Sequence, residues 1–507
     1  MKMIGLGRVF LIVCWNLGLS AMAIAGGPVI TVSSPPNGSD QTSPVHYAAS
    51  ATSPGCAKGI AATRIYTGPN VSAFTVQGGR LDANVAFGPG FFNTVVEAWD
   101  NCGGVASTPI NITVASANLA PPTFLYDAEF STGKVAGFTV NPTTGALTPI
   151  AQSPVWAHWG PVGIASDKGG FRLYVANQGS QDLNAYFINR HDGSLAPVPG
   201  SPFESGGTGT NVAVAPSGKF VYVTTDSSHG GSDGVSGFKV DANGSLLRVP
   251  GSPFFAGTMP GSIAIDPAGK YVFVGHESSA SPDAYAINVF SINQVDGSLT
   301  SVPGEPFAIT TPSECYLCGG GGVYDLKTDL SGNYLFAPVS GDGTVAVFRV
   351  DRSTGSLSPA TGSPFVLSLP DSPTAPGAEP DSITVDPNNL YVYVDIVSGD
   401  ADGDVSRNAI AILSLNSSTG ALAGATDFTV PQDTCNQNNI RTDPSGKFLY
   451  VVGESGCEQF AGSPTGPGVI LGLSKQSKPG TLTPLPGSPF SVQDDPVNST
   501  DRIIVTP

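Results

Sequence analysis

A six-residue phrase returns along this chain almost unchanged, and this repetition limits the folds open to it more than any other feature. VPGSPF occupies residues 198–203 and 249–254, VPGEPF residues 302–307, LPGSPF residues 485–490, and a shorter TGSPF residues 361–365. Self-similarity at a regular spacing is the signature of repeat proteins, in which each unit buries its apolar face against its neighbours. The sequence therefore predicts an array of similar units.

Two further phrases keep the same spacing and define the unit. A turn of Gly, a small residue and Leu occurs seven times, 48 to 65 residues apart. A phrase of the type DPAGKYVFV occurs six times and predicts a tight turn followed by a strand rich in Tyr and Val. Each unit thus comprises four antiparallel strands, the last ending in the SPF phrase. This is the plan of a propeller blade.

The two ends of the repeat region complete one another. The first unit starts at TFLYDAEF, residues 123–130, with the second strand of the other units, so an innermost strand is missing there. The final DRIIVTP, residues 501–507, matches NNIRTDP, residues 438–444. We expect residues 503–506 to pair with residues 124–127, which closes the ring and leaves no edge strand. The fold class is therefore predicted to be all-β, with a seven-bladed β-propeller over residues 123–507 and each SPF phenylalanine packed between blades.

The residues before the repeats have another organisation. Residues 27–116 alternate apolar and polar side chains in short runs such as VITVSS and VHYAASA, which predicts a two-sheet sandwich. This segment resembles bacterial immunoglobulin-like domains, with AWDNCGG near the place where such domains carry an AWD stretch. Residues 117–122 are predicted to be a short, stiff linker.

The N-terminal 25 residues have the pattern of a cleaved secretory signal: Lys2 and Arg8 precede an apolar run, and A-x-A sites end at Ala23 and Ala25. We therefore expect a secreted, periplasmic or cell-surface protein without a transmembrane segment. The net charge of −17 disfavours nucleic acid and anionic membranes as partners. A carbohydrate, a cell-wall component or a protein ligand is the expected partner of a monomeric chain.

Seven cysteines become six when Cys14 leaves with the signal, an even number in an oxidising compartment. The predicted disulfides are Cys56/Cys102, Cys315/Cys318 and Cys435/Cys457. The CYLC stretch at Cys315 is alternatively half of a metal site or a redox pair, although neither a second CxxC nor a nearby histidine accompanies it.

The repeats DPAGKYVFV, INVFSINQVDGSLT and VPGSPF resemble the lactonase-type seven-bladed propellers, the family of 6-phosphogluconolactonases and muconate-lactonising enzymes, with kinship to YVTN-type surface repeats. The resemblance covers residues 123–507. It implies a site of histidine, arginine and carboxylate groups at the mouth of the central channel, just before the innermost strands. Here those positions form two rings, Gly163, Asn211, Ser262, Asp325, Ser382, Asn439 and Arg502, and, one residue earlier, Val162, Thr210, Gly261, Tyr324, Asp381, Asn438 and Asp501.

Neither ring contains a histidine, and His158 is the nearest one. Strand alternation places Asp325 on the same side as Lys327, and Asn439 on the same side as Arg441. A cation pair beside a carboxylate suits an acid or phosphate group of a ligand, while a carboxylate or histidine activates water against an ester carbonyl. The catalytic candidates are Asp325, Asp381 and His158. The substrate-binding candidates are Lys327, Arg441, Arg502, Asn439 and Asn211. The alternative is that Lys327 and Arg441 are solvated or ion-paired in a wet channel.

A weaker signal lies in SGDADGDVSRN, where Asp400, Asp402 and Asp404 alternate like the start of a calcium loop. The stretch departs from an EF-hand because Gly403 stands at the fourth place and Ala411 at the twelfth. A looser calcium site and a solvated turn both fit, and no other cofactor is expected.

Two functions follow as expectations. The favoured one is a secreted binding or surface-associated propeller that presents its loop-rich face to a partner. The alternative is a lactone hydrolase of the resembled family that acts on an extracellular sugar lactone, since 6-phosphogluconolactone is a cytosolic metabolite.

Overall fold

The computed structural model describes residues 27–506 except 69–70, 88–89, 116–121, 277–284, 310–321, 341, 368–377, 399–406, 431–434, 455–466, 477–480 and 497–501. Every regular element in these ranges is a β-strand, so none of them contains a helix that could cross a membrane. The chain divides into two compact units, Met1–Ala120 and Pro121–Pro507. The predicted signal segment, residues 1–25, lies outside the described residues.

The N-terminal unit consists of two sheets. The three-stranded sheet has the order β1 (Val29–Ser34), β3 (Val45–Thr52), β6 (Arg80–Val85). The five-stranded sheet has the order β2 (Ser39–Thr42), β8 (Val105–Ala115), β7 (Gly90–Asp100), β4 (Ile60–Gly68), β5 (Val71–Gln77). Tyr47, Ile65, Leu81 and Val96 from the two sheets share one core. The immunoglobulin-like nature of this unit stays a prediction.

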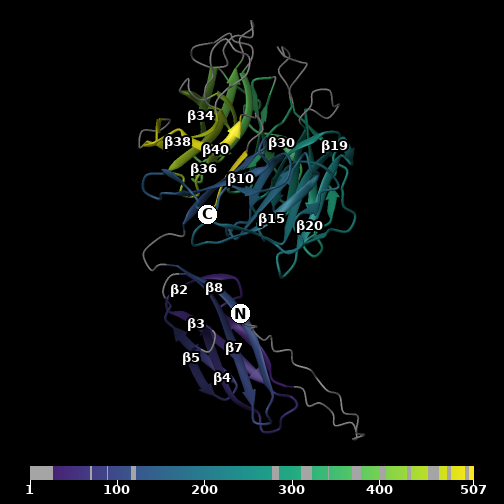
Figure 1. The fold of residues 1–507 in the computed structure, drawn as a ribbon. Coiled ribbons are helices and arrows are strands. Elements are labelled where there is room, and N and C mark those ends of the chain that lie inside the picture. Colours follow the sequence, from purple (N-terminus) through teal and green to yellow (C-terminus); the bar gives the residue numbers. More distant parts are fainter. Residues whose placement is uncertain are drawn as a thin grey trace, which may run out of the picture. The chain divides into compact units, whose positions relative to one another are not determined.

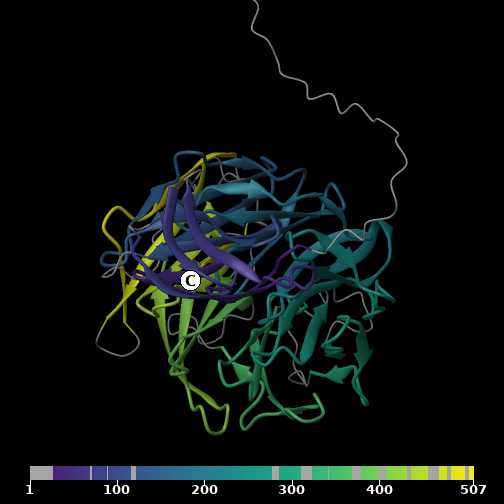
Figure 2. The same cartoon turned by 90° about the horizontal axis from the view of Figure 1, so that it is seen from below.

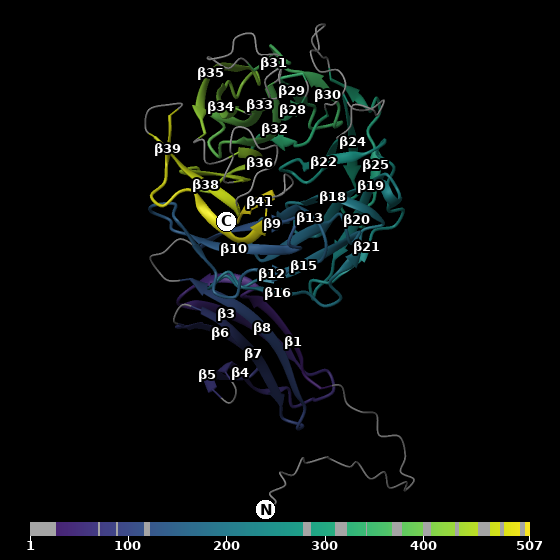
Figure 3. The same cartoon turned by 45° about the horizontal axis from the view of Figure 1, so that its top comes forward.

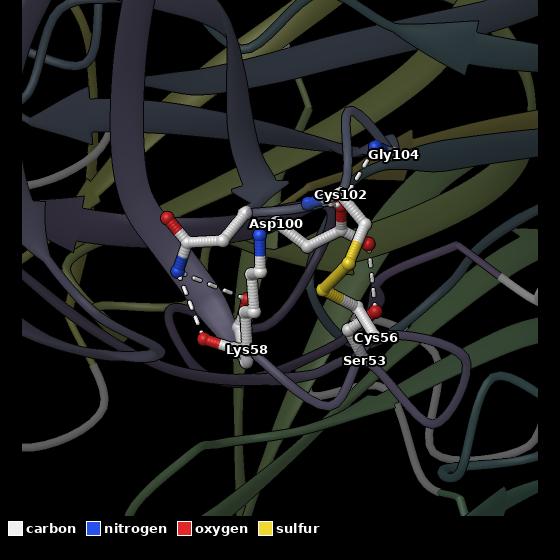
Figure 4. The surroundings of a disulfide bond; sticks show 8 residues. Ser53, Cys56, Lys58, Asp100, Cys102 and Gly104 are labelled. Carbon is white, nitrogen blue, oxygen red and sulfur yellow. Dashed lines mark hydrogen bonds between the residues drawn. A yellow bond between two sulfur atoms is a disulfide. The ribbon is translucent and has the colours of Figure 1, made fainter.

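A disulfide joins the loops at one end of the N-terminal unit. Cys56 and Cys102 are bonded, with their Cα atoms 5.8 Å apart (Figure 4). The carboxylate of Asp100 beside them accepts hydrogen bonds from the Ser53 hydroxyl and from the Gly104 backbone N–H at 2.7 Å each (Figure 4). The bond and this carboxylate tie two loops that are 46 residues apart in the sequence.

The second unit contains seven antiparallel sheets in its described residues, each starting from one innermost strand. The innermost strands are β41 (Arg502–Val505), β13 (Pro161–Ser166), β18 (Gly207–Val214), β22 (Pro260–Ile265), β27 (Lys327–Thr328), β32 (Ala378–Val385) and β36 (Cys435–Thr442). The second strands are β9 (Thr123–Glu129), β14 (Arg172–Asn177), β19 (Phe220–Gly231), β23 (Tyr271–His276), β28 (Tyr334–Val339), β33 (Tyr391–Ser398) and β37 (Phe448–Glu454).

Two more strands complete each sheet. The third strands are β10 (Lys134–Val140), β15 (Asp182–Ile188), β20 (Gly234–Val240), β24 (Ala286–Ile292), β29 (Thr344–Val350), β34 (Arg407–Leu415) and β38 (Pro467–Lys475). The outer strands are β11 (Leu147–Pro149), β16 (Leu195–Pro197), β21 (Leu246–Arg248), β25 (Leu299–Ser301), β30 (Leu357–Pro359), β35 (Leu422–Thr429) and β39 (Leu482–Pro484). The predicted seven-bladed, all-β plan is confirmed (Figures 1 and 3).

The C-terminal strand closes the ring, as predicted. In β41, Ile503 pairs with Asp127 and Val505 with Leu125 of β9. The Thr506 backbone N–H donates to the Phe124 carbonyl at 2.8 Å. The yellow C-terminal strands lie beside the blue first blade in Figures 2 and 3. The first blade therefore combines both ends of the propeller and exposes no innermost edge.

The SPF phrase differs from the prediction in one respect. It does not end the fourth strand but begins a separate short strand that pairs with the third strand, as in β17 (Phe203–Glu204) against β15. The other such strands are β26 (Phe307–Ala308), β31 (Phe365–Val366) and β40 (Phe490–Pro496), and in the first blade β12 (Val155–Trp156) follows Ser153-Pro154 in the same way. The phenylalanines pack between blades as expected, since Phe203 contacts the core shared by blades two and three.

The serine of the SPF phrase fills a gap in the hydrogen bonding of the third strand. Its hydroxyl accepts the backbone N–H that lies between the partners of the outer strand and of the short strand. These bonds are Gly137 N–H to Ser153 (2.5 Å), Ala185 to Ser201 (3.0 Å), Gly237 to Ser252 (2.9 Å), Val347 to Ser363 (2.9 Å) and Gly472 to Ser488 (2.9 Å).

Within the described residues, six glycines of the Gly-small-Leu turns dock against the preceding blade, and the seventh, Gly480, lies outside those residues. Gly297 has φ +81°, and a Cβ atom there would lie 2.5 Å from the Phe220 ring. Its carbonyl accepts the Tyr222 hydroxyl at 2.8 Å. Gly145 is placed in the same way against Phe448, across the closure of the ring. Glycine recurs because only a residue without a side chain allows this contact.

Candidate functional site

The innermost strands carry a β-bulge just before the first predicted ring. The register shifts before Gly163, Asn211, Ser262, Ser382 and Asn439. A bulge leaves one extra residue outside the ladder and re-aims its side chain, and bulges are frequent beside active sites. Asp381 is the extra residue of β32. Asp381 therefore lies outside the strand ladder, whereas Ser382 next to it pairs with Asp395 of β33.

Polar side chains of the first ring link consecutive blades. Asp325 Oδ2 accepts the Ser382 hydroxyl at 2.9 Å and the Ile383 backbone N–H at 3.3 Å. The Ser382 hydroxyl oxygen accepts the Ile440 N–H at 3.2 Å. Asn439 Oδ1 accepts the Ile503 N–H at 3.2 Å. Asp325 and Asn439, both predicted site residues, thus hold neighbouring innermost strands together.

Two cations meet the Asp325 carboxylate. Arg441 Nη1 lies 2.9 Å from Oδ2 and Lys327 Nζ lies 3.2 Å from Oδ1. The carboxylate is 2% exposed, Arg441 13% and Lys327 29%. Burial raises the pKa of Asp325, but the charges of Arg441, Lys327 and Arg502 outweigh it and hold this pKa well below its usual range. Asp325 is therefore a permanently ionised anchor and unsuited to proton transfer near neutral pH.

The Lys327 ammonium, unlike the Asp325 carboxylate, can lose its charge at mildly alkaline pH. Burial and the like charge of Arg441 lower its pKa to about 8, although Asp325 opposes the shift. Lys327 and Arg441 line a cavity of about 210 Å³ together with apolar side chains of the innermost strands. Asn211, another predicted binding residue, also lines this cavity. The innermost strands thus enclose a small, mainly apolar pocket with two cationic side chains on its wall.

Arg502 connects this cluster to a second carboxyl group. Its guanidinium donates to the Tyr324 carbonyl at 3.4 Å and influences the pKa values of both Asp325 and Asp381. Burial, followed by the negative charge of Glu379, raises the pKa of Asp381 to about 7, while Arg502 and the Ser340 hydroxyl oppose the shift. Asp381 can therefore exchange a proton near neutral pH, which is the property required of a general base.

Asp395 is a site residue that the sequence reasoning missed. It stands opposite Ser382 on β33, is fully buried, and neither carboxylate oxygen has a hydrogen-bond partner among the described residues. Burial raises its pKa well above the usual range, and the charge of Asp381 acts in the same direction. An acidic residue inside the apolar run YVYVDIV was the available signal.

Other predicted residues lie elsewhere. His158 Nδ1 is 2.8 Å from Asp182 Oδ2 of β15, and none of its contacts is with the Asp325 cluster or Asp381. Its assignment as a catalytic residue beside them gains no support from this position. The calcium candidates Asp400, Asp402 and Asp404, and Cys315, Cys318 and Cys457, lie outside the described residues. So does the side chain of Cys435, whose backbone pairs with Glu454.

One acidic and sulfur-containing group has the spacing of a metal site within the described residues: Cys56, Asp100 and Cys102. The two sulfur atoms are bonded to each other, so they are not available as thiolate ligands.

Comparison with known proteins agrees with the fold. The family model described as lactonase, 7-bladed beta-propeller, matches residues 115–208 and 198–315. A 6-phosphogluconolactonase of Formosa agariphila is 22% identical over 239 residues, 47% of this chain. The match spans 62% of that relative's length.

Solved structures are similar over most of the chain. The periplasmic gluconolactonase of Pseudomonas aeruginosa has a TM-score of 0.56 at 15% identity, and the match covers 76% of this chain and 99% of that one. A protein from Lactobacillus plantarum has a TM-score of 0.51 at 14% identity, covering 76% and 99%. At these identities the likeness concerns the fold alone.

Proposed function

We propose that this protein is a lactone hydrolase that acts outside the cytoplasm on a sugar lactone bearing an anionic group. One observation carries the proposal: the charge of Arg502 acts both on Asp381, a carboxyl group with a pKa of about 7, and on Asp325, which pairs with Arg441 and Lys327. Lys327, Arg441 and Arg502 act on the ionised Asp325 carboxylate there, and their ammonium and guanidinium groups have further N–H donors that an anionic ligand could accept. The names of the similar gluconolactonases support the reaction class.

The proposed reaction uses the residues as follows. Lys327, Arg441 and Arg502 attract the anionic group and orient the lactone carbonyl. Asp381 in its carboxylate form takes a proton from water, whose oxygen bonds to the carbonyl carbon. The ring C–O bond then breaks, and Asp381 returns the proton to the leaving oxygen. The product is the open hydroxy acid.

The pKa values give the proposal a characteristic pH dependence. Asp381 must be ionised, so kcat/KM rises through about pH 7. Lys327 must be charged, so kcat/KM for an anionic lactone falls above about pH 8. For a neutral lactone, kcat/KM should still rise through about pH 7 but should fall much less above pH 8, because binding of a neutral substrate does not depend on the charge of the Lys327 ammonium.

The test is hydrolysis of gluconolactone, 6-phosphogluconolactone and γ-butyrolactone by the full chain, followed in a pH-stat. Asp381→Asn should lower kcat by about 100-fold or more, in the range of a lost general base. Arg502→Gln should raise KM for the phosphorylated lactone more than for γ-butyrolactone. Asp386→Asn, directly after β32, removes the buried ion pair with Lys475 and is the control for effects on folding alone. Rates equal to buffer for every lactone would reject the hydrolase.

A second candidate is a secreted binding propeller without catalysis. The observation in its favour is that Asp325, Ser382, Asn439 and Arg441 complete each other's hydrogen bonds, so the cluster is stable as an ion-pair network alone. In that case an acidic saccharide such as gluconate should bind in calorimetry, with weakened binding in Arg502→Gln, while no lactone is turned over.

A further inference from the structure

Two exposed tryptophans, Trp156 and Trp159, meet edge to face in a segment that the proposed reaction does not use, and we call the angle between their two rings the notch. Trp156 is 50% exposed and Trp159 63% exposed. Their ring centroids are 5.3 Å apart and their planes meet at 89°. They are two of only four tryptophans in the chain. The segment that bears them leads from β12 of the first blade to β13 of the second (Figure 3).

The backbone is shaped to hold both indoles in place. A Cβ atom on Gly133 would lie 2.7 Å from the Trp156 ring, and one on Gly179 would lie 3.1 Å from Trp159 Cβ. The backbone N–H of Trp159 donates to the Ser180 hydroxyl at 2.7 Å. The Tyr186 hydroxyl donates to the Trp156 carbonyl at 2.9 Å. The two rings are thus held in place before any ligand binds. Because half or more of each tryptophan is exposed, burial of these rings contributes little to the stability of the fold.

Polar groups border this notch in a fixed arrangement. His158 lies between the two tryptophans in sequence, with its ring centroid 6.4 Å from that of Trp156. Its Nδ1 is held by Asp182 Oδ2 at 2.8 Å, and Asp182 Oδ1 accepts the Asn177 amide at 2.6 Å. The imidazole is 37% exposed, and Nδ1 makes its only hydrogen bond within the described residues. With Nδ1 directed to Asp182, Nε2 is the ring nitrogen left for a hydrogen bond with a ligand.

We propose that Trp156, Trp159 and His158 form a binding site for a neutral pyranose ring of an oligosaccharide or polysaccharide. A pyranose presents a face of C–H groups and a rim of hydroxyls. The C–H face stacks on one indole, the second indole borders its edge, and a hydroxyl donates to His158 Nε2. This inference does not depend on whether the channel is catalytic.

The charges favour this ligand over other occupants. The Asp182 carboxyl group, which contacts His158, disfavours uronic acids and other anionic sugars. The net charge of −17 repels an anionic bilayer, which is otherwise a common target of exposed tryptophan. A protein partner is the remaining alternative, and it would leave every neutral oligosaccharide in the experiment below unbound.

The experiment screens the full chain against neutral cello-, xylo-, manno- and chito-oligosaccharides on an array and measures the best ligand by calorimetry and tryptophan fluorescence. We expect saturable binding that shifts the indole emission. Trp159→Ala should weaken binding at least tenfold, and Trp159→Tyr should recover part of it because a ring is restored. His158→Ala should weaken binding by a smaller factor.

The matched control is Phe255→Ala, since Phe255 is a single aromatic residue, 73% exposed, on the corresponding loop before β22. Its removal should leave binding unchanged. The melting temperature of each variant identifies any loss of folding, and Trp159→Tyr remains informative if Trp159→Ala is unstable. The proposal is overturned if no neutral oligosaccharide binds, if Trp159→Ala and Trp159→Tyr both bind as the parent does, or if the indole emission shifts only with phosphatidylserine vesicles.

Discussion

The raised pKa of Asp381 makes the stability of the folded chain depend on pH. This pKa, about 7 in the folded chain, is above the ordinary aspartate value, mainly because of burial. Between these two pKa values the Asp381 carboxyl group is ionised in the unfolded chain but protonated in the folded chain. The free energy of unfolding therefore falls as the pH rises from about 4 to about 7, and the loss is complete above pH 7.

Asp381→Asn removes this penalty. We expect the variant to be more stable than the parent by about 4 kcal/mol at pH 8, since the pKa of Asp381 is raised from 3.8 to about 7, and nearly equal to it at pH 4. Calorimetric melting of the propeller across this range measures the difference. Asp296→Asn is the control with the opposite sign, because hydrogen bonds from Ser298 lower the pKa of Asp296. A pH-independent effect of Asp381→Asn would contradict the assignment.

The Asp325 cluster allows a second prediction. Arg441→Met leaves a carboxylate that is 2% exposed without its closest cation, and breaking such a pair costs about 3–5 kcal/mol. Lys327→Met should cost less, because Lys327 is more exposed and its distance to the carboxylate is longer. The double variant Asp325→Asn/Arg441→Met should recover most of the loss. Urea unfolding measures all four proteins, and equal costs for the two single variants would refute this account.

At the scale of the element, the glycine turn gives the sharpest comparison. Gly297→Ala combines a positive φ with a Cβ atom 2.5 Å from Phe220. Gly362→Ala has nearly the same φ, +79°, but nothing within 4 Å of the new Cβ. We expect about 1 kcal/mol of destabilisation for Gly362→Ala and about 3 kcal/mol or more for Gly297→Ala. The difference in melting temperature reports the contact between blades alone, and no difference would mean that the turn moves freely.

The repeated phrases could be read as elements because their chemistry is local. The carboxylate of Asp266 accepts the backbone N–H groups of Lys270 (2.5 Å) and Tyr271 (2.7 Å), so a DPAGKY stretch forms its turn whatever surrounds it. The short SPF strand was missed as a separate element because it pairs with the same third strand as the outer strand does, as β16 and β17 both pair with β15. Sequence spacing does not show that the Ser252 hydroxyl is needed by the Gly237 N–H.

At the scale of the whole molecule, stability rests on closure. Deletion of residues 502–507 removes β41, exposes the edge of β9 and takes the fully buried Ile503 from the core shared with the seventh blade. We expect the melting temperature of the propeller to fall by more than about 10 °C, with dimers or aggregates on size-exclusion chromatography. Ile504→Ala, a partly buried position of the same strand, should give a smaller decrease. A monomer with unchanged melting would contradict closure as the source of stability.

The sequence by itself determined the number of blades and the closing strand, because each blade repeats the same turn chemistry and the same strand alternation. It also placed Asp325 with Lys327, since residues two apart in a strand share a side. Only the tertiary structure brought Arg441 onto Asp325 across 116 residues, set Arg502 beside Asp381 and directed His158 to Asp182. Those contacts depend on how seven sheets are arranged around one axis, and this arrangement is a property of the closed ring.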